Sequence, residues 1–162
     1  MGKKSFAALS AFVLTVAMMA APFAEAAEVT RDSYKEAVEP ICKTNVQANE
    51  RILKGVKGEV KAGKLKPAAA KFSKAAEALH KAIGKLKAVP QPTADEARLA
   101  KWLKYIEEEE GFFIKIAKKL KAGDKNGATA MQIRLSHTAS QANNTVLPFE
   151  FKYCRVEPSK FS

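Results

Sequence analysis

The stretch from Thr93 to Gly123 constrains the fold most, because it lies in the longest proline-free part of the chain and has a regular helical period. Its apolar side chains recur every three or four residues, at Leu99, Leu103, Ile106, Phe113, Ala117 and Leu120. This spacing is typical of a helix that packs lengthwise against other helices. Glu110 interrupts the series. The sequence therefore predicts the central helix of a bundle here.

A second helix is predicted from Leu65 or Pro67 to Lys87, where apolar residues step by four and three without interruption. The members of this series are Leu65, Ala69, Phe72, Ala76, Leu79, Ile83 and Leu86. Pro90 and Pro92 then favour an extended link. Thr93 and Glu96 have the spacing of a capping box, which predicts that the central helix begins at this point.

The first helix of the bundle is predicted to begin at Ser33, because Ser33 and Glu36 form a capping box, with Thr30 as the alternative cap. Pro40 predicts a kink or a short first segment, since its ring clashes with the preceding turn. The glycine-rich residues 55–64 are interpreted as the end of this helix and its connection to the next.

The last helix follows Gly123, with Asp124 or Asn126 as its cap, and ends before Pro148. The tail that follows carries aromatic residues before Cys154, and we expect it to form a lid tied to the first helix. Four helices with short connections predict an all-α, up-and-down antiparallel four-helix bundle closed by one disulfide.

Residues 1–26 have the layout of a secretory signal peptide, with a short basic head, an apolar run and a small-residue ending at Ala24-Glu25-Ala26. We expect cleavage after Ala26, which leaves residues 27–162 as one domain that is secreted or extracytoplasmic, with no transmembrane span. An uncleaved membrane anchor is the alternative, since the apolar run is nearly long enough to cross a bilayer.

The two cysteines, Cys42 and Cys154, lie near the two ends of the mature chain. Export places them in an oxidising compartment, where pairing is the default, so we expect a disulfide between them. Free buried thiols or an intermolecular bridge are the alternatives. Their spacing does not match the common metal motifs, and no metal ligand set or cofactor is predicted.

Several short motifs resemble a widespread group of uncharacterised secreted helical-bundle proteins from actinobacteria that carry one cysteine near each end. The motifs are Tyr34, Ile41-Cys42, Asn45, the Pro90/Pro92 linker, Trp102-Leu103, Gly123-Asp124 and an aromatic residue shortly before Cys154. Here Pro148, Phe149 and Glu150 stand where that group has a glycine. The resemblance implies an exported bundle with an end-to-end disulfide, and it implies no activity.

Three polar residues fall on the apolar faces of three helices, each near its midpoint: Asn45, Glu110 and Thr138. Midpoints lie at one height in an antiparallel bundle, so these residues predict a buried polar layer. Such a layer either holds a ligand or fixes the register of the helices. The other interpretation is that Glu110 turns aside to solvent, where a run of four glutamates is ordinarily found.

The mature chain has a formal charge of +10, because removal of Lys3, Lys4 and Glu25 takes one unit from the +11 of the whole chain. Residues 54–87 carry ten lysines and two acids. Five of the lysines, Lys64, Lys71, Lys74, Lys81 and Lys85, form one stripe along the helix predicted at residues 65–87. The stripe is interpreted either as an anion-binding surface or as a solvated coat.

No hydrolase, nucleotide-binding or zinc-protease motif is present, so no catalytic residue is predicted and the chain is interpreted as a non-enzyme. The leading hypothesis is docking of the lysine stripe on an anionic cell-envelope polymer. Sequence-specific nucleic acid is not expected as a partner, because the stripe lacks arginines and aromatic residues. The alternative is a small-ligand or metal carrier that uses the polar layer. The oligomeric state is not predicted.

Overall fold

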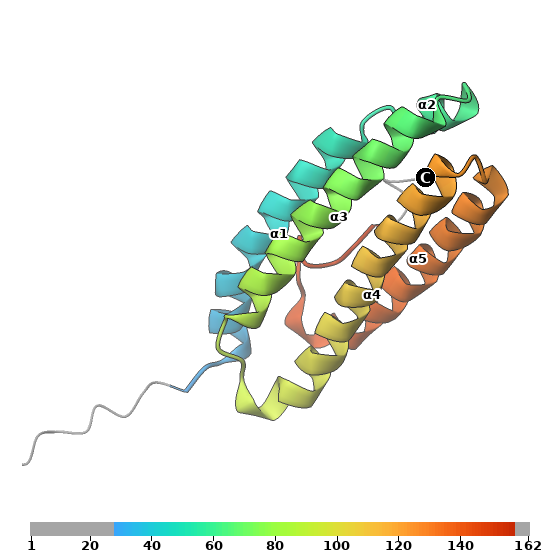
Figure 1. Ribbon diagram of the computed structural model, residues 1–162. Coiled ribbons are helices and arrows are strands. Elements are labelled where there is room, and N and C mark those ends of the chain that lie inside the picture. Colours follow the sequence, from blue (N-terminus) through green and yellow to red (C-terminus); the bar gives the residue numbers. More distant parts are fainter. Residues whose placement is uncertain (1–27, 158–162) are drawn as a thin grey trace, which may run out of the picture.

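The computed structural model describes residues 28–157, and the predicted four-helix bundle is confirmed there (Figure 1). The four long helices are α1 (Arg31–Leu53), α3 (Leu65–Lys87), α4 (Glu96–Lys121) and α5 (Lys125–Thr145). The short elements are α2 (Val56–Lys61), η1 (Thr93–Asp95) and η2 (Leu147–Phe149). The disulfide between Cys42 and Cys154 is also confirmed. The predicted signal peptide lies outside the described residues.

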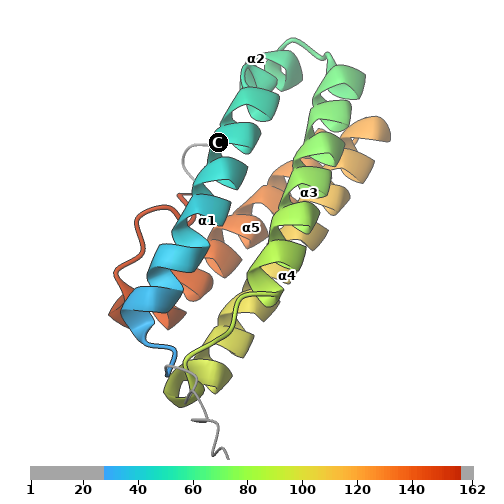
Figure 2. The same cartoon turned by 90° about the vertical axis from the view of Figure 1, so that its left-hand side faces the viewer.

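The helices pack in chain order, α1 on α3, α3 on α4 and α4 on α5. α1 and α5 share no comparable contact. The segment after α5 runs back between them, as the red tail in Figures 1 and 2 shows. The C-terminal tail therefore takes the place of the fourth helix–helix contact and closes the bundle.

The apolar core follows the predicted seams and extends beyond them. All six apolar residues of the α4 series are buried, and so are Trp102 and Ile116 on the same helix. α3 buries its whole series except Leu65, which is half-buried. The buried face of each helix is thus a broad stripe, as in a globular bundle. No helix within residues 28–157 combines the length and apolar character needed to cross a membrane.

The starts of the helices differ in part from the prediction. Thr30 caps α1 and pairs reciprocally with Ser33, so the box expected between Ser33 and Glu36 is wrong and the alternative cap is confirmed. The earlier start lets Arg31 bind the buried carboxylate of Asp95, with Nε and Nη2 at 2.6 and 2.9 Å from its oxygens. This ion pair joins the start of α1 to the turn before α4.

The other predicted breaks and caps agree with the structure in part. α1 continues through Pro40 as one helix, so no separate first segment forms. The capping box predicted at Thr93 is wrong, because Thr93 begins the turn η1 and α4 has no side-chain cap. Asp124 caps α5 as predicted, accepting a hydrogen bond of 2.7 Å from the Gly127 amide. The predicted connection at residues 55–64 contains the short helix α2.

Candidate functional site

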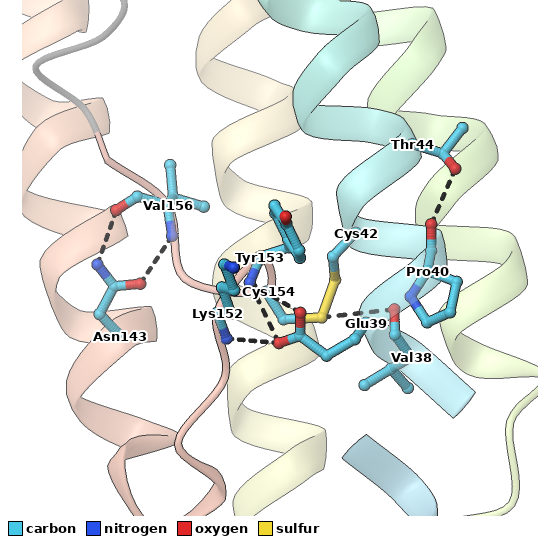
Figure 3. Close-up of a disulfide and its surroundings, with 10 residues drawn as sticks. All are labelled: Val38, Glu39, Pro40, Cys42, Thr44, Asn143, Lys152, Tyr153, Cys154 and Val156. Carbon is cyan, nitrogen blue, oxygen red and sulfur yellow. Dashed lines mark hydrogen bonds between the residues drawn. A yellow bond between two sulfur atoms is a disulfide. The ribbon is translucent and has the colours of Figure 1, made fainter. Parts of the chain in front are cut away.

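The C-terminal tail is fixed to α1 by two adjacent interactions (Figure 3). The disulfide joins Cys154 to Cys42 near the middle of α1. One turn earlier, the Glu39 carboxylate accepts hydrogen bonds from the backbone amides of Lys152 and Tyr153, at 2.6 and 2.9 Å. The tail is thus held on α1 by a covalent bond and a charge-assisted clamp.

A third interaction fixes the tail to α5. The Asn143 side chain donates to the Val156 carbonyl at 2.8 Å and accepts from the Val156 amide at 2.9 Å (Figure 3). Glu150 turns the chain into the tail with φ of 50°, in the left-handed region that favours glycine. The tail therefore begins at a non-glycine residue in a backbone conformation that glycine adopts most readily.

A cavity of about 390 Å³ lies beneath the tail. Its walls come from α1, α3, α4 and residues 152–157, so the tail forms its cover. The apolar part of the lining includes Val46, Leu79, Leu86, Ile106 and Phe113. This volume is within the range of sites that hold small molecules.

Glu109 is the unusual residue of the cavity. Its side chain lies in the lining but is only 2% exposed, and its Oε1 atom has no hydrogen-bond partner among residues 28–157. Burial raises the pKa of Glu109 to about 8, because the charged form is poorly solvated there. A buried carboxyl without a partner is costly, so it is a candidate ligand-binding group.

Asn49 presents a second such group from α1. It is 3% exposed, lines the same cavity, and its Oδ1 atom has no hydrogen-bond partner within the described residues. Its amide nitrogen donates to Asn45 Oδ1 at 3.4 Å, and Asn45 is also part of the lining. α1 and α4 therefore each place a buried oxygen that has no partner within the described residues in the wall of one cavity.

The remaining charged residues of the lining are of both signs. α1 contributes Glu50, and the tail contributes Lys152, Arg155 and Glu157. With Glu109 the lining holds three carboxyl groups and two cations. No histidine or serine is among the described residues of the lining, and the sulfur atoms of both cysteines are bonded to each other.

The predicted polar layer is only partly assembled at this site. Asn45 lines the cavity, but Glu110 and Thr138 do not. Glu110 is 19% exposed and lies 3.1 Å from Nδ1 of His80 on α3, while Thr138 is buried on α5. The prediction thus chose Glu110 where the cavity holds its neighbour Glu109. Trp102 and Ile116, each seven residues from Glu109 and both buried, are the sequence signal that favours position 109.

The predicted lysine stripe is exposed on α3 at Lys64, Lys74, Lys81 and Lys85. Lys71 is different, because it is half-buried and its Nζ atom binds Glu59 Oε1 at 2.6 Å and the Lys54 carbonyl at 2.8 Å. One of the five lysines therefore fixes α2 to α3. The other four are accessible to a partner.

No group of three or more His, Cys, Asp or Glu side chains within residues 28–157 is placed to hold a metal ion. No protein-family model, curated protein or solved structure matches this chain.

Proposed function

We propose that this protein is an exported, non-enzymatic carrier of a small amphipathic amine. The observation that carries the proposal is the buried Glu109 carboxyl group, which lies in the wall of the cavity under the tail and has an oxygen without a hydrogen-bond partner among the described residues. Export rests on the predicted signal peptide and is supported by the disulfide, because such bonds persist in oxidising compartments.

The chemistry of the cavity selects the ligand class. Asn49 Oδ1 and the ionised form of Glu109 are both acceptors, so a ligand that supplies hydrogen-bond donors satisfies both groups. An ammonium group supplies several, and it stabilises the charged form of Glu109 that burial alone disfavours. The apolar walls then cover an alkyl or aromatic body.

The same lining supports binding rather than a reaction. The described lining contains no histidine, serine or free thiol, so the common pairs of a nucleophile with a histidine base are not present there. Holding and releasing a ligand requires only the cavity and its cover. The tail, fixed at Glu39, Cys42 and Asn143, is that cover.

Calorimetric titration with octylamine and with octanol tests the proposal, because the two probes share a chain and differ in the charged head group. Octylamine is expected to bind and octanol to bind much more weakly. Glu109→Gln should weaken octylamine binding about ten- to hundredfold, since a hydrogen bond to a charged group is lost. Glu108→Gln, at an exposed neighbouring position, is the matched control. Equal binding of both probes that Glu109→Gln leaves unchanged would disprove the amine site.

The pH dependence of octylamine binding gives an independent test. Below about pH 8 free Glu109 is protonated and must lose its proton to pair with an ammonium group. Affinity should therefore rise by up to about tenfold per pH unit on approach to pH 8 and then level off. The other titratable groups at the cavity are Glu50, Lys152, Tyr153, Arg155 and Glu157, and Glu109→Gln should remove the rise while they remain.

A further inference from the structure

Two basic segments far apart in sequence meet at one end of the bundle. Residues 54–74 comprise the chain that directly follows α1, then α2 and the start of α3, and residues 111–134 comprise the end of α4 and the start of α5. Because α1 and α4 run one way and α3 and α5 the other, both segments lie at the end that carries α2 (Figures 1 and 2). We call them together the basic end.

The net charge of the described chain is concentrated in the basic end. Residues 54–74 hold seven lysines and one glutamate, and residues 111–134 hold five lysines, one arginine and one aspartate. The other described residues hold twelve basic and fourteen acidic side chains. The bundle is therefore strongly positive at one end and close to balanced over the rest.

Both acids of the basic end are engaged by its own lysines. Glu59 is bound by Lys71 at 2.6 Å, and Asp124 is bound by Lys119 at 2.8 Å while it caps α5. All basic residues of the basic end except Lys71 are exposed. The positive field there is thus directed outward with little internal compensation.

We propose that the basic end is a docking surface for a linear, flexible polymer of phosphodiesters without bases. The inference goes beyond the proposed carrier function and does not depend on it, because none of the basic side chains of the basic end lines the cavity. Twelve of the thirteen cations are lysines, which act as point charges and do not require the planar acceptors that arginine favours.

Two observations favour such a polymer over nucleic acid and over a lipid bilayer. Residues 54–74 and 111–134 contain no fully exposed aromatic side chain, and the half-buried Phe112 has the Lys115 ammonium group 5.0 Å from its ring centroid, so bases would find a poor stacking platform. Ile114 and Ile133 are the only large apolar side chains strongly exposed in these segments, and two such residues do not make the apolar face that insertion into a lipid bilayer needs. A flexible chain of phosphates can contact the α2–α3 and α4–α5 turns together.

The test measures binding of long-chain inorganic polyphosphate to the full mature protein as salt is varied. The basic-end variant carries Lys61→Gln, Lys64→Gln, Lys121→Gln and Lys125→Gln, two positions at each turn. The control variant carries Lys81→Gln, Lys85→Gln, Lys101→Gln and Lys104→Gln, four exposed positions outside the basic end with the same change in net charge.

The basic-end variant should lose at least about tenfold in affinity, and the slope of log K against log salt should fall by about 3, as expected for four lost phosphate contacts. The control should stay within about threefold of the natural protein. The Lys61/Lys64 pair and the Lys121/Lys125 pair should each give part of the loss, since the surface has two halves.

Three outcomes would overturn the inference. Equal losses in both variants would mean a response to net charge alone. A greater loss in the control variant than in the basic-end variant would move the binding surface to the parts of α3 and α4 that carry the control positions. Tighter binding to single-stranded DNA or to phosphatidylglycerol vesicles than to polyphosphate, at equal phosphate concentration, would assign the surface to another class of partner. Octylamine binding should be unaffected in every variant, which separates this inference from the carrier function.

Discussion

The C-terminal tail covers two regions of the bundle that are built in opposite ways. At its start, Phe149 and Phe151 stack on each other with centroids 5.1 Å apart and contact Tyr34 and Trp102. All four of these side chains are at most 3% exposed. Further on, the tail covers the cavity with its polar Glu109 and Asn49. We call the first region the aromatic cluster.

The difference shows that one segment can combine stability with room for a ligand. Close packing of large rings contributes apolar burial and ring–ring contacts. The cavity lacks such contacts, and its wall contains two oxygen atoms without hydrogen-bond partners within the described residues, Glu109 Oε1 and Asn49 Oδ1. We infer that the aromatic cluster anchors the tail, so that the cavity does not need to be filled for the bundle to close.

The largest effect is expected from removal of the disulfide, which lies beyond the aromatic cluster along the tail. Cys42→Ser with Cys154→Ser should lower the free energy of unfolding by about 5 kcal/mol, because the bond closes a loop with a sequence separation of 112. Urea denaturation measures this loss. Hydrogen exchange should quicken at the Lys152 and Tyr153 amides more than at Phe149, whereas an equal change at all three would show that the tail moves as one unit.

The next effect concerns Glu109 and the pH dependence of stability. Its pKa of about 8 in the folded protein exceeds the ordinary 4.5, so the folded state holds the proton more tightly than the unfolded state. Stability should therefore fall as pH rises from about 4.5 to 8, by on the order of 4 kcal/mol, and then level off.

Urea denaturation at pH 5 and pH 9 measures this fall. Glu109→Gln should remove most of it and be the more stable form at pH 9. Glu108→Gln should keep it, since that side chain is exposed. A natural protein as stable at pH 9 as at pH 5 would contradict the burial of an unpaired carboxyl group in the cavity.

The aromatic cluster should be more sensitive to truncation than the tail segment over the cavity. Phe151→Ala should lower the free energy of unfolding by about 3 to 4 kcal/mol, because it removes contacts with Phe149 and Trp102 and leaves a void. Val156→Ala, at a half-buried position over the cavity, should cost less than about 1 kcal/mol. Similar losses in both variants, measured by urea denaturation, would remove the contrast between the two regions.

The fold was predictable from the sequence because the seams of α3 and α4 repeat over several turns. The spacing of apolar residues identifies the buried face of a helix. It does not decide which of several identical neighbouring residues lies on that face. Residues 107–110 are all glutamate, and steps of three then four or of four then three both connect Ile106 to Phe113. The prediction took position 110, whereas the buried Trp102 and Ile116 turn position 109 inward.

The cavity itself could not be predicted, because it depends on the path of the tail rather than on any helix period. Asn49 and Glu109 line a cavity under the tail because α1 and α5 do not pack closely on each other and residues 152–157 run between them. The basic end has a similar origin. Its two halves are separated in sequence by the second half of α3 and the first half of α4, and only the antiparallel topology brings them together.

The smallest effect is expected from removal of a buried polar group in the aromatic cluster. The change shows whether such a group lowers stability there as it does in the cavity. The Tyr34 hydroxyl group has no hydrogen-bond partner within the described residues, and burial raises the pKa of Tyr34 to about 12. Because the ring packs in the aromatic cluster and the hydroxyl bonds to nothing there, Tyr34→Phe should be neutral or stabilising by up to about 1 kcal/mol. Urea denaturation and octylamine titration together measure the outcome, and binding should be unchanged. A destabilised Tyr34→Phe variant would mean that the hydroxyl group has a hydrogen-bond partner in solution. The aromatic cluster would then contain a buried polar group that needs a partner, as the cavity does.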